Sequence, residues 1–217
     1  MKHAITAAML LALAGTWPAA RAAEPSTGTG VEAGWILERL VRPAPSRTPF
    51  VELRQSRLLK TPLRLEGEYR RPADDVLVRE VQVPYAETTT LRDGEAVIER
   101  AGRNPRRVSL DGAPELAGLR GSFEALLAGD RDVLEREFDL RAEGGRERWT
   151  LHLAPKDAAL RQLGTLILKG RGSELRCIEA VPEAGAPQRT LLAGAAMDAH
   201  GLEAPEALAA LCHAPAR

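Results

Sequence analysis

Aromatic residues, cysteines and the short motifs of common enzymes are scarce in this sequence of 217 residues. Phe, Trp and Tyr together make up 4% of it, and it has two cysteines and four histidines. It lacks a G-x-S-x-G elbow, a G-x-x-x-x-G-K-[ST] phosphate loop and a dinucleotide fingerprint, and no two histidines have the spacing of an H-E-x-x-H metal site. We therefore predict a protein that is not an enzyme, with no catalytic residues, cofactor or metal ion.

An excess of charge of either sign is also absent. The chain carries 30 Lys and Arg residues against 30 Asp and Glu residues, and the two kinds are interleaved. A nucleic-acid-binding protein needs a net positive face to contact phosphates. The balance argues against a nucleic-acid partner and indicates an ordinary solvated surface.

The longest apolar run of the chain lies at its N-terminus. Lys2 and His3 precede the apolar stretch 4–15, and Ala20-Arg21-Ala22 fits the A-x-A pattern of a cleavage site. This arrangement is typical of a signal peptide, and the run is too short to span a bilayer. We expect a signal peptide over 1–22, cleaved after Ala22, and a single exported domain over 23–217 without a transmembrane segment.

The two cysteines, Cys177 and Cys212, both follow the expected cleavage site. An even count in an exported protein favours a disulfide. Such a bond would close a loop of about 35 residues and stabilise the fold by roughly 3–4 kcal/mol in the chain-entropy model. We predict that the two cysteines pair, with two buried free thiols as the alternative.

Hydrophobic periodicity divides the exported chain into a helix, strands, helices and strands again. A helical stripe predicts a helix over 31–41, alternation predicts strands over 48–59, 61–71 and 76–83, and Asp93-Gly94 predicts a tight hairpin turn. Further elements are expected as a strand at 106–110, helices within 113–138, strands at 138–144, 147–155, 164–170, 174–181 and 187–194, and a helix at 203–212. This order predicts an α+β fold, a curved antiparallel sheet whose helices gather on its apolar concave face.

The stretch LRLEGEYRRP (residues 63–72) places a cation at the end of an apolar strand face. Leu63, Leu65, Gly67 and Tyr69 share that face, and Arg71 continues their row directly before proline. A buried cation is costly unless it is paired or hydrogen-bonded. The strand pattern alone favours an arginine whose stem packs on the sheet while its head reaches solvent.

A series of landmarks in this order resembles the LolA family of periplasmic lipoprotein carriers, from about residue 31 to residue 195. They are Leu53-x-Gln55, G-E-Y-R-R-P (67–72), Pro84, LRDGEAV (91–97), LLAGDRDVLEREF (126–138) and LHLAPK (151–156). The resemblance implies a half-open β-barrel with helices as a lid over a hydrophobic cavity. It also implies a periplasmic carrier that shields a lipid or acylated cargo, such as a lipoprotein, and transfers it towards the outer membrane, between a donor in the inner membrane and an acceptor in the outer membrane.

The resemblance also implies which residues contact the cargo or hold the lid. Arg71 matches the family's functional arginine, which is expected to hydrogen-bond to the lid and to act as a latch. The residues expected to bind lipid or to contact the lid are Arg71, Leu63, Leu65, Tyr69, Val76, Val78, Ile98, Leu126, Leu127, Leu151, Leu153, Leu166 and Leu168.

The sequence departs from the family pattern at two positions where family members often carry tryptophan. Arg79 and Ile98 stand there instead. The departures resemble a divergent branch associated with aryl polyene or related lipid pathways, whose cargo would be a lipid. Two alternatives from other classes stay open: a sensor or adaptor that binds a protein partner on the same fold, and a lipid-modifying enzyme.

Overall fold

The computed structural model of the chain describes residues 30–54, 61–110, 125–126, 128–161, 164–182 and 187–213. The expected signal peptide over 1–22 and the expected site residue Leu127 lie outside these ranges. So does 113–124, the first part of the region predicted to be helical.

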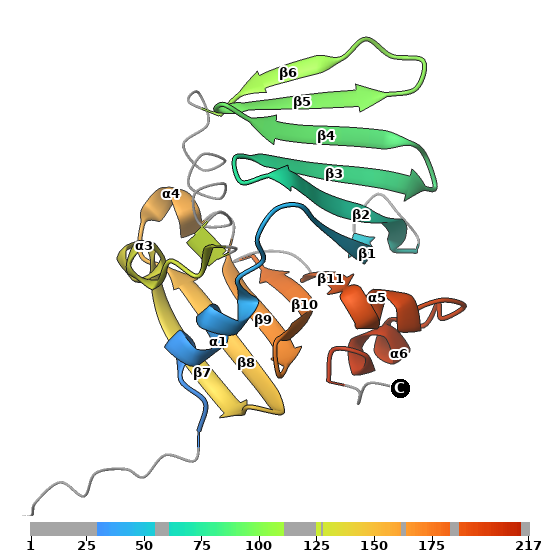
Figure 1. Ribbon diagram of the computed structural model, residues 1–217. Helices are drawn as coiled ribbons and strands as arrows, with labels where there is room; N and C mark the ends of the chain where they lie inside the picture. Colours follow the sequence, from blue (N-terminus) through green and yellow to red (C-terminus); the bar gives the residue numbers. More distant parts are fainter. Residues whose placement is uncertain are drawn as a thin grey trace, which may run out of the picture.

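One antiparallel sheet of 11 strands forms the body of the described chain. The strands lie in the spatial order β6-β5-β4-β3-β2-β1-β11-β10-β9-β8-β7, so β1 and β11 join an N-terminal half to a C-terminal half. Because the order begins with β6 and ends with β7, the sheet is open, and Figure 1 shows α1 lying over its C-terminal half. The strands are β1 (Ser46–Arg54), β2 (Leu63–Ala73), β3 (Val76–Val83), β4 (Glu87–Arg92), β5 (Glu95–Arg100), β6 (Arg106–Ser109), β7 (Phe138–Gly145), β8 (Arg148–Pro155), β9 (Thr165–Arg171), β10 (Glu174–Val181) and β11 (Gln188–Leu192).

The predicted curved α+β fold is confirmed, and each predicted strand has a counterpart in the sheet. The Asp93-Gly94 turn between β4 and β5 is a clear example. Asp93 has φ 49° and Gly94 has φ 74°. Two successive residues with positive φ are what a type I′ hairpin turn requires, and Asp-Gly adopts this conformation at little cost.

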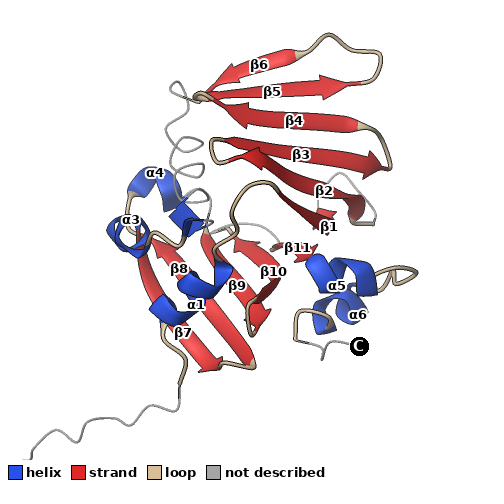
Figure 2. Cartoon of the chain, in the orientation of Figure 1, coloured by secondary structure: helices blue, strands red, loops and turns tan. Residues whose placement is uncertain are grey.

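Alternation along the strands gives the sheet two faces with different cores. On the concave face, α1 (Ala33–Leu40) buries Ile36, Leu37 and Leu40 in a cluster that includes Trp149 and Leu151 of β8. The same cluster takes in Leu134 of α3 (Arg131–Glu137) and Leu160 of α4 (Ala158–Arg161). Three helices therefore cover the C-terminal half of the concave face, as Figure 2 shows.

The ends of two of these helices are well defined. The helix predicted over 31–41 ends at Leu40 in the structure, and Val41 lies beyond its end and is 40% exposed. Asp130 lies directly before α3, and its side chain accepts a hydrogen bond from Val133 N at 3.1 Å. An N-cap of this kind satisfies a backbone donor that the helix itself leaves unpaired.

The expectation that all helices gather on one face is wrong for the C-terminal helices α5 (Ala193–Asp198) and α6 (Pro205–Ala210). Their apolar residues pack with Val51 of β1, Leu191 of β11 and Cys177 of β10. These three residues alternate along their strands with residues of the concave face, so they point to the opposite, convex face. Figure 1 shows α5 and α6 beside β11, away from α1. The sequence did not predict α5, because Ala193 and Gly194 continue the strand pattern of β11.

A bulge in β10 anchors the C-terminal helices to the convex face. The pairing of β10 with β9 shifts between Leu175 and Cys177, which leaves Arg176 as the extra residue. Arg176, only 1% exposed, donates to the Leu211 carbonyl at 3.1 Å and forms an ion pair with Asp198 at 3.2 Å.

The predicted disulfide between Cys177 and Cys212 is confirmed. It ties the end of α6 to the same stretch of β10 that carries Arg176, across a sequence separation of 35 residues. The C-terminal helices are thus attached to the sheet covalently as well as by burial.

Candidate functional site

A cavity of about 290 Å³ lies between the concave face of the sheet and the end of α1. This volume is at the lower end of the range for small-molecule pockets, roughly 300–1,000 Å³. Strands from both halves of the sheet contribute to its wall. The residues that line it are Leu40, Arg42, Ser46, Thr48, Tyr69, Arg70, Arg71, Leu77, Leu126, Leu153, Leu166, Leu168, Glu174, Leu175, Ile178, Thr190, Leu192 and Ala193.

Strand register explains why these side chains converge. Leu166 pairs with Leu153 of the neighbouring strand, and Leu168 pairs with Ile178. Residues that are directly opposite on adjacent antiparallel strands point to the same side of the sheet. The C-terminal half of the sheet therefore offers a continuous aliphatic wall to the cavity.

Arg71 lies at the end of the cavity formed by β1 and β2. It pairs with Ser46 of β1, and its side chain is 12% exposed. Its Nη1 donates to the Arg42 carbonyl at 2.5 Å, and its Nη2 lies 3.2 Å from the Asp74 carbonyl and 3.1 Å from Asp74 Oδ1. The guanidinium thus joins β2 to the segment that leads from α1 into β1.

Arg42 continues this set of contacts to the other half of the sheet. Its guanidinium donates to the carbonyls of Arg39 and Val41 at 3.0 and 2.9 Å, and also to the carbonyl of Ser173 in the turn before β10. Arg71 and Arg42 together connect β2, the end of α1 and β10 across one end of the cavity.

A buried polar cluster lies next to the cavity, on the neighbouring row of cross-strand residues. Glu52 of β1 is 4% exposed and accepts from Arg79 Nη2 at 2.6 Å. Arg79 also lies over the Phe50 ring, 4.8 Å from its centroid, and pairs across the strands with Tyr69. Burial raises the pKa of the Tyr69 phenol above its ordinary value, an effect that the charge of Arg79 only partly offsets. Arg79, one of the two departures from the expected family pattern, is therefore paired with an acid.

The structure brings together six of the predicted site residues around the cavity. These are Arg71, Tyr69, Leu126, Leu153, Leu166 and Leu168. Leu63 and Leu65 pack in the same apolar cluster as Tyr69, on the concave face, but they do not line the cavity. Leu151 is fully buried in the core beneath α1.

Three predicted residues lie away from the cavity. Val78 is directly opposite Arg70, so its side chain points to the face of the sheet opposite Tyr69. Val76, two residues earlier in β3, points to that same outer face. The residue of β3 that lines the cavity is Leu77, which lies between the two valines. Ile98 is on the concave face but three strands beyond β2. The sequence misplaced the valines because a bulge between Arg70 and Ala73 shifts the register by a residue.

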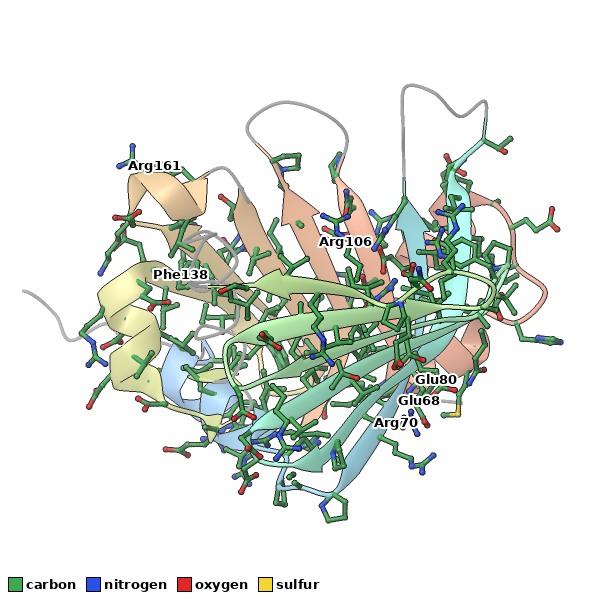
Figure 3. The ribbon with its side chains drawn as sticks, turned by 90° about the horizontal axis from the view of Figure 1, so that it is seen from above. Glu68, Arg70, Glu80, Arg106, Phe138 and Arg161 are labelled. Atoms are coloured by element: carbon green, nitrogen blue, oxygen red, sulfur yellow. A yellow bond between two sulfur atoms is a disulfide. The ribbon has the colours of Figure 1, made fainter. Side chains whose placement is uncertain are left out.

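Arg70 borders the cavity, but its charged head lies elsewhere. Its Nη2 forms an ion pair with Glu80 Oε2 at 2.6 Å. Glu80 pairs with Glu68 across the strands, and Figure 3 shows Glu68, Arg70 and Glu80 close together. These three residues alternate with Gly67, Tyr69 and Arg79 and so lie on the outer face of the sheet.

Sequence reasoning missed several residues of the cavity wall. Among them are Arg42 and Ser46, which lie in or next to a segment with two prolines that the sequence marks only as a helix end. Ile178 is directly opposite Leu168 on one neighbouring strand and Thr190 on the other, so all three side chains point to the same face of the sheet. Predicting this from the sequence requires the register of three strands. Within the described ranges, no three His, Cys, Asp or Glu side chains form a metal-binding group, and no helix has the length and apolarity needed to cross a membrane.

Comparison with known proteins gives a family and a set of related solved structures, which include the two below. A sequence model described as outer membrane lipoprotein carrier protein LolA-like matches residues 22–216. LolA superfamily protein NE2245 from Nitrosomonas europaea is 12% identical, with a TM-score of 0.39 over 75% of this chain and 91% of that one. LprF from Mycobacterium bovis is 11% identical, with a TM-score of 0.34 over 76% of this chain and 94% of that one. No curated protein matches the sequence significantly.

Proposed function

Because the chain belongs to the family of LolA-like outer membrane lipoprotein carrier proteins, we propose that it is a periplasmic carrier that shields a lipid or acylated cargo and transfers it towards the outer membrane. The observation that carries this proposal is the aliphatic cavity between α1 and the concave face of the sheet. An acyl chain in this cavity would be removed from water, which favours binding by roughly 25 cal/mol per Å² of buried apolar surface.

We assign the latch to Arg71, because its contacts connect the sheet to the helix that covers the cavity. An arginine that only reached solvent would leave its head exposed, whereas the side chain of Arg71 is 12% exposed and donates to the Arg42 carbonyl, just beyond the end of α1. Cargo that displaces α1 must break this charge-assisted hydrogen bond. The latch therefore favours the position of α1 close to the sheet, and its loss favours entry of cargo.

Native mass spectrometry of protein purified from periplasm tests the proposal directly. We expect a bound acyl species that organic extraction removes, and binding of a fluorescent fatty acid by the extracted protein. Failure to detect any bound acyl species, together with no binding of the probe, would refute a carrier role. A stoichiometric protein partner captured without lipid would instead support the adaptor alternative.

A pair of variants on one strand links binding to the cavity. Leu166 lines the cavity, whereas Ile167 is the next residue of β9 and points to the opposite face. Both side chains are half-buried. Leu166→Gln should weaken binding of the fatty acid probe, and Ile167→Gln should leave it nearly unchanged. Equal effects of the two substitutions would show that the probe binds elsewhere.

A further inference from the structure

Three polar residues of the cavity lining, Arg42, Ser46 and Arg71, lie together at one end. Arg71 and Ser46 pair across β1 and β2, and Arg71 donates to the carbonyl of Arg42. The far wall, formed by β8 and β9, contributes Leu153, Leu166 and Leu168. The cavity is therefore amphipathic, with a cationic end and an aliphatic end.

The two cations at this end are only partly satisfied by the protein. A guanidinium has five N–H donors. Arg42 directs three of them at backbone carbonyls, and no carboxylate of the described chain forms an ion pair with it. Arg71 pairs with Asp74, whose side chain is 83% exposed and therefore well solvated. Each arginine retains donors that could bind a further acceptor.

The acid in the cavity lining does not neutralise these cations. Glu174 accepts from the Gly194 backbone N at 2.8 Å and forms an ion pair with Arg176 at 3.2 Å. Arg176 belongs to the convex face, where it also contacts Asp198. The carboxylate of Glu174 is thus already used to hold α5 and β10, and within the described chain it forms no ion pair with Arg42 or Arg71.

We propose that the cargo is an anionic amphiphile, whose phosphate or carboxylate head is bound by Arg42 and Arg71 while its acyl chain lies along the aliphatic wall. This inference rests on the carrier function proposed above and adds the chemical class of the cargo. Guanidinium binds carboxylate and phosphate oxygens through charge-assisted hydrogen bonds, and the low exposure of the Arg71 side chain, 12%, strengthens those that it makes. A neutral head would form weaker hydrogen bonds there, and a cationic head would be repelled.

Probes with the same acyl chain and different heads test the proposal on the extracted full-length mature protein. Myristate and myristoyl lysophosphatidic acid supply a carboxylate and a phosphate, and monomyristoylglycerol supplies a neutral head. Calorimetric titration, below the concentration at which each probe aggregates, should show binding of at least one anionic probe about tenfold or more tighter than the monoglyceride. Which anion binds tighter distinguishes a fatty-acid-type cargo from a phospholipid-type cargo.

Variants at the cationic end locate the preference. Arg42→Gln should reduce the preference for the anion over the monoglyceride to less than about threefold. Arg47→Gln is the matched control, because Arg47 is 69% exposed and pairs with Glu68 on the outer face. Circular dichroism and the melting midpoint of each variant check that it is folded.

Two results would overturn the inference without affecting the carrier role. Equal affinities for the anionic and neutral probes would show that the head is not recognised. A preference that survives both Arg42→Gln and Arg71→Gln would show that other groups bind the anion. Failure of all three probes to bind would instead count against the carrier function itself, so the two failures are distinguishable.

Discussion

Replacement of Arg71 by leucine tests the latch, and the structure limits how large the effect can be. Arg71 makes two kinds of contact: one to the Arg42 carbonyl, and one to Asp74 in the adjoining turn between β2 and β3. Only the first joins β2 to the segment that carries α1. We expect the fold to be kept, because Leu63, Leu65 and Tyr69 already make this strand face apolar.

The expected change in the position of α1 follows from that one hydrogen bond. A charge-assisted hydrogen bond contributes roughly 1.5–3 kcal/mol net. Its loss would shift the equilibrium between the latched and displaced positions of α1 by roughly 10- to 150-fold towards the displaced one. The variant should take up apolar probe faster and transfer it poorly to acceptor vesicles, because return of α1 to the sheet no longer helps to expel the cargo.

Stopped-flow fluorescence with a fatty acid probe measures uptake, and transfer to vesicles that carry a quencher measures release. Arg70→Leu is the internal control, because the charged head of Arg70 pairs with Glu80 on the outer face. A partly exposed pair of this kind contributes about 0–1 kcal/mol, so its loss should change neither rate much. If Arg71→Leu and Arg70→Leu have the same uptake and release kinetics, Arg71 is not a latch.

Three further predictions concern the frame of the molecule. Replacing Cys177 and Cys212 together by serine should lower the free energy of unfolding by roughly 3–4 kcal/mol in urea denaturation, and a loss of less than about 1 kcal/mol would contradict the role of the disulfide. Gly67→Ala would place a Cβ 1.9 Å from the Glu80 carbonyl oxygen, so β2 and β3 must separate; the expected cost is roughly 1–3 kcal/mol or more, and an unchanged melting midpoint would show that the strands accommodate it freely. The pKa of Glu179 lies below its ordinary value of 4.5, because hydrogen bonds from two basic neighbours outweigh the opposing effect of burial. A carboxyl with a lowered pKa stabilises the fold at pH values above its unfolded pKa, and that contribution is lost as the pH falls through its folded pKa. The unfolding free energy of Glu179→Gln should therefore fall less than that of the unmodified protein between about pH 6 and about pH 3. Equal pH dependence of the two unfolding free energies would contradict this prediction.

Local sequence patterns were sufficient to predict the strands and the faces of most of them. Alternation in 63–71 correctly placed Tyr69 and Arg71 on one side and Arg70 on the other, because successive side chains of any strand point to opposite faces. Asp93-Gly94 fixed its hairpin for an equally local reason, the positive φ of both residues. These features depend on neighbouring residues alone, so they can be predicted without knowledge of the fold.

The pairing of the cysteines is an intermediate case. An even cysteine count after an apparent signal peptide was enough to predict the disulfide between Cys177 and Cys212. It did not indicate the bulge in β10, which leaves Arg176 as an extra residue beside Cys177, in contact with the C-terminal helices. The number of cysteines was enough to predict which residues form the disulfide. The register of β10 against β9 determined that Arg176 also holds the C-terminal helices at this point of the sheet.

Only the tertiary structure decided which side chains share the cavity and which face each helix covers. The family resemblance led us to expect Val78 in the wall, but a bulge in the β2–β3 pairing puts Leu77 there instead. Arg42 belongs to no periodic segment, yet it lies at the cationic end, because the chain between α1 and β1 crosses from one half of the sheet to the other. A local pattern specifies the direction of a side chain relative to its own strand, but a cavity depends on the register of many strands and on the path of the segments between them. Those are set by burial and hydrogen bonding across the whole sheet, which no short stretch of sequence contains.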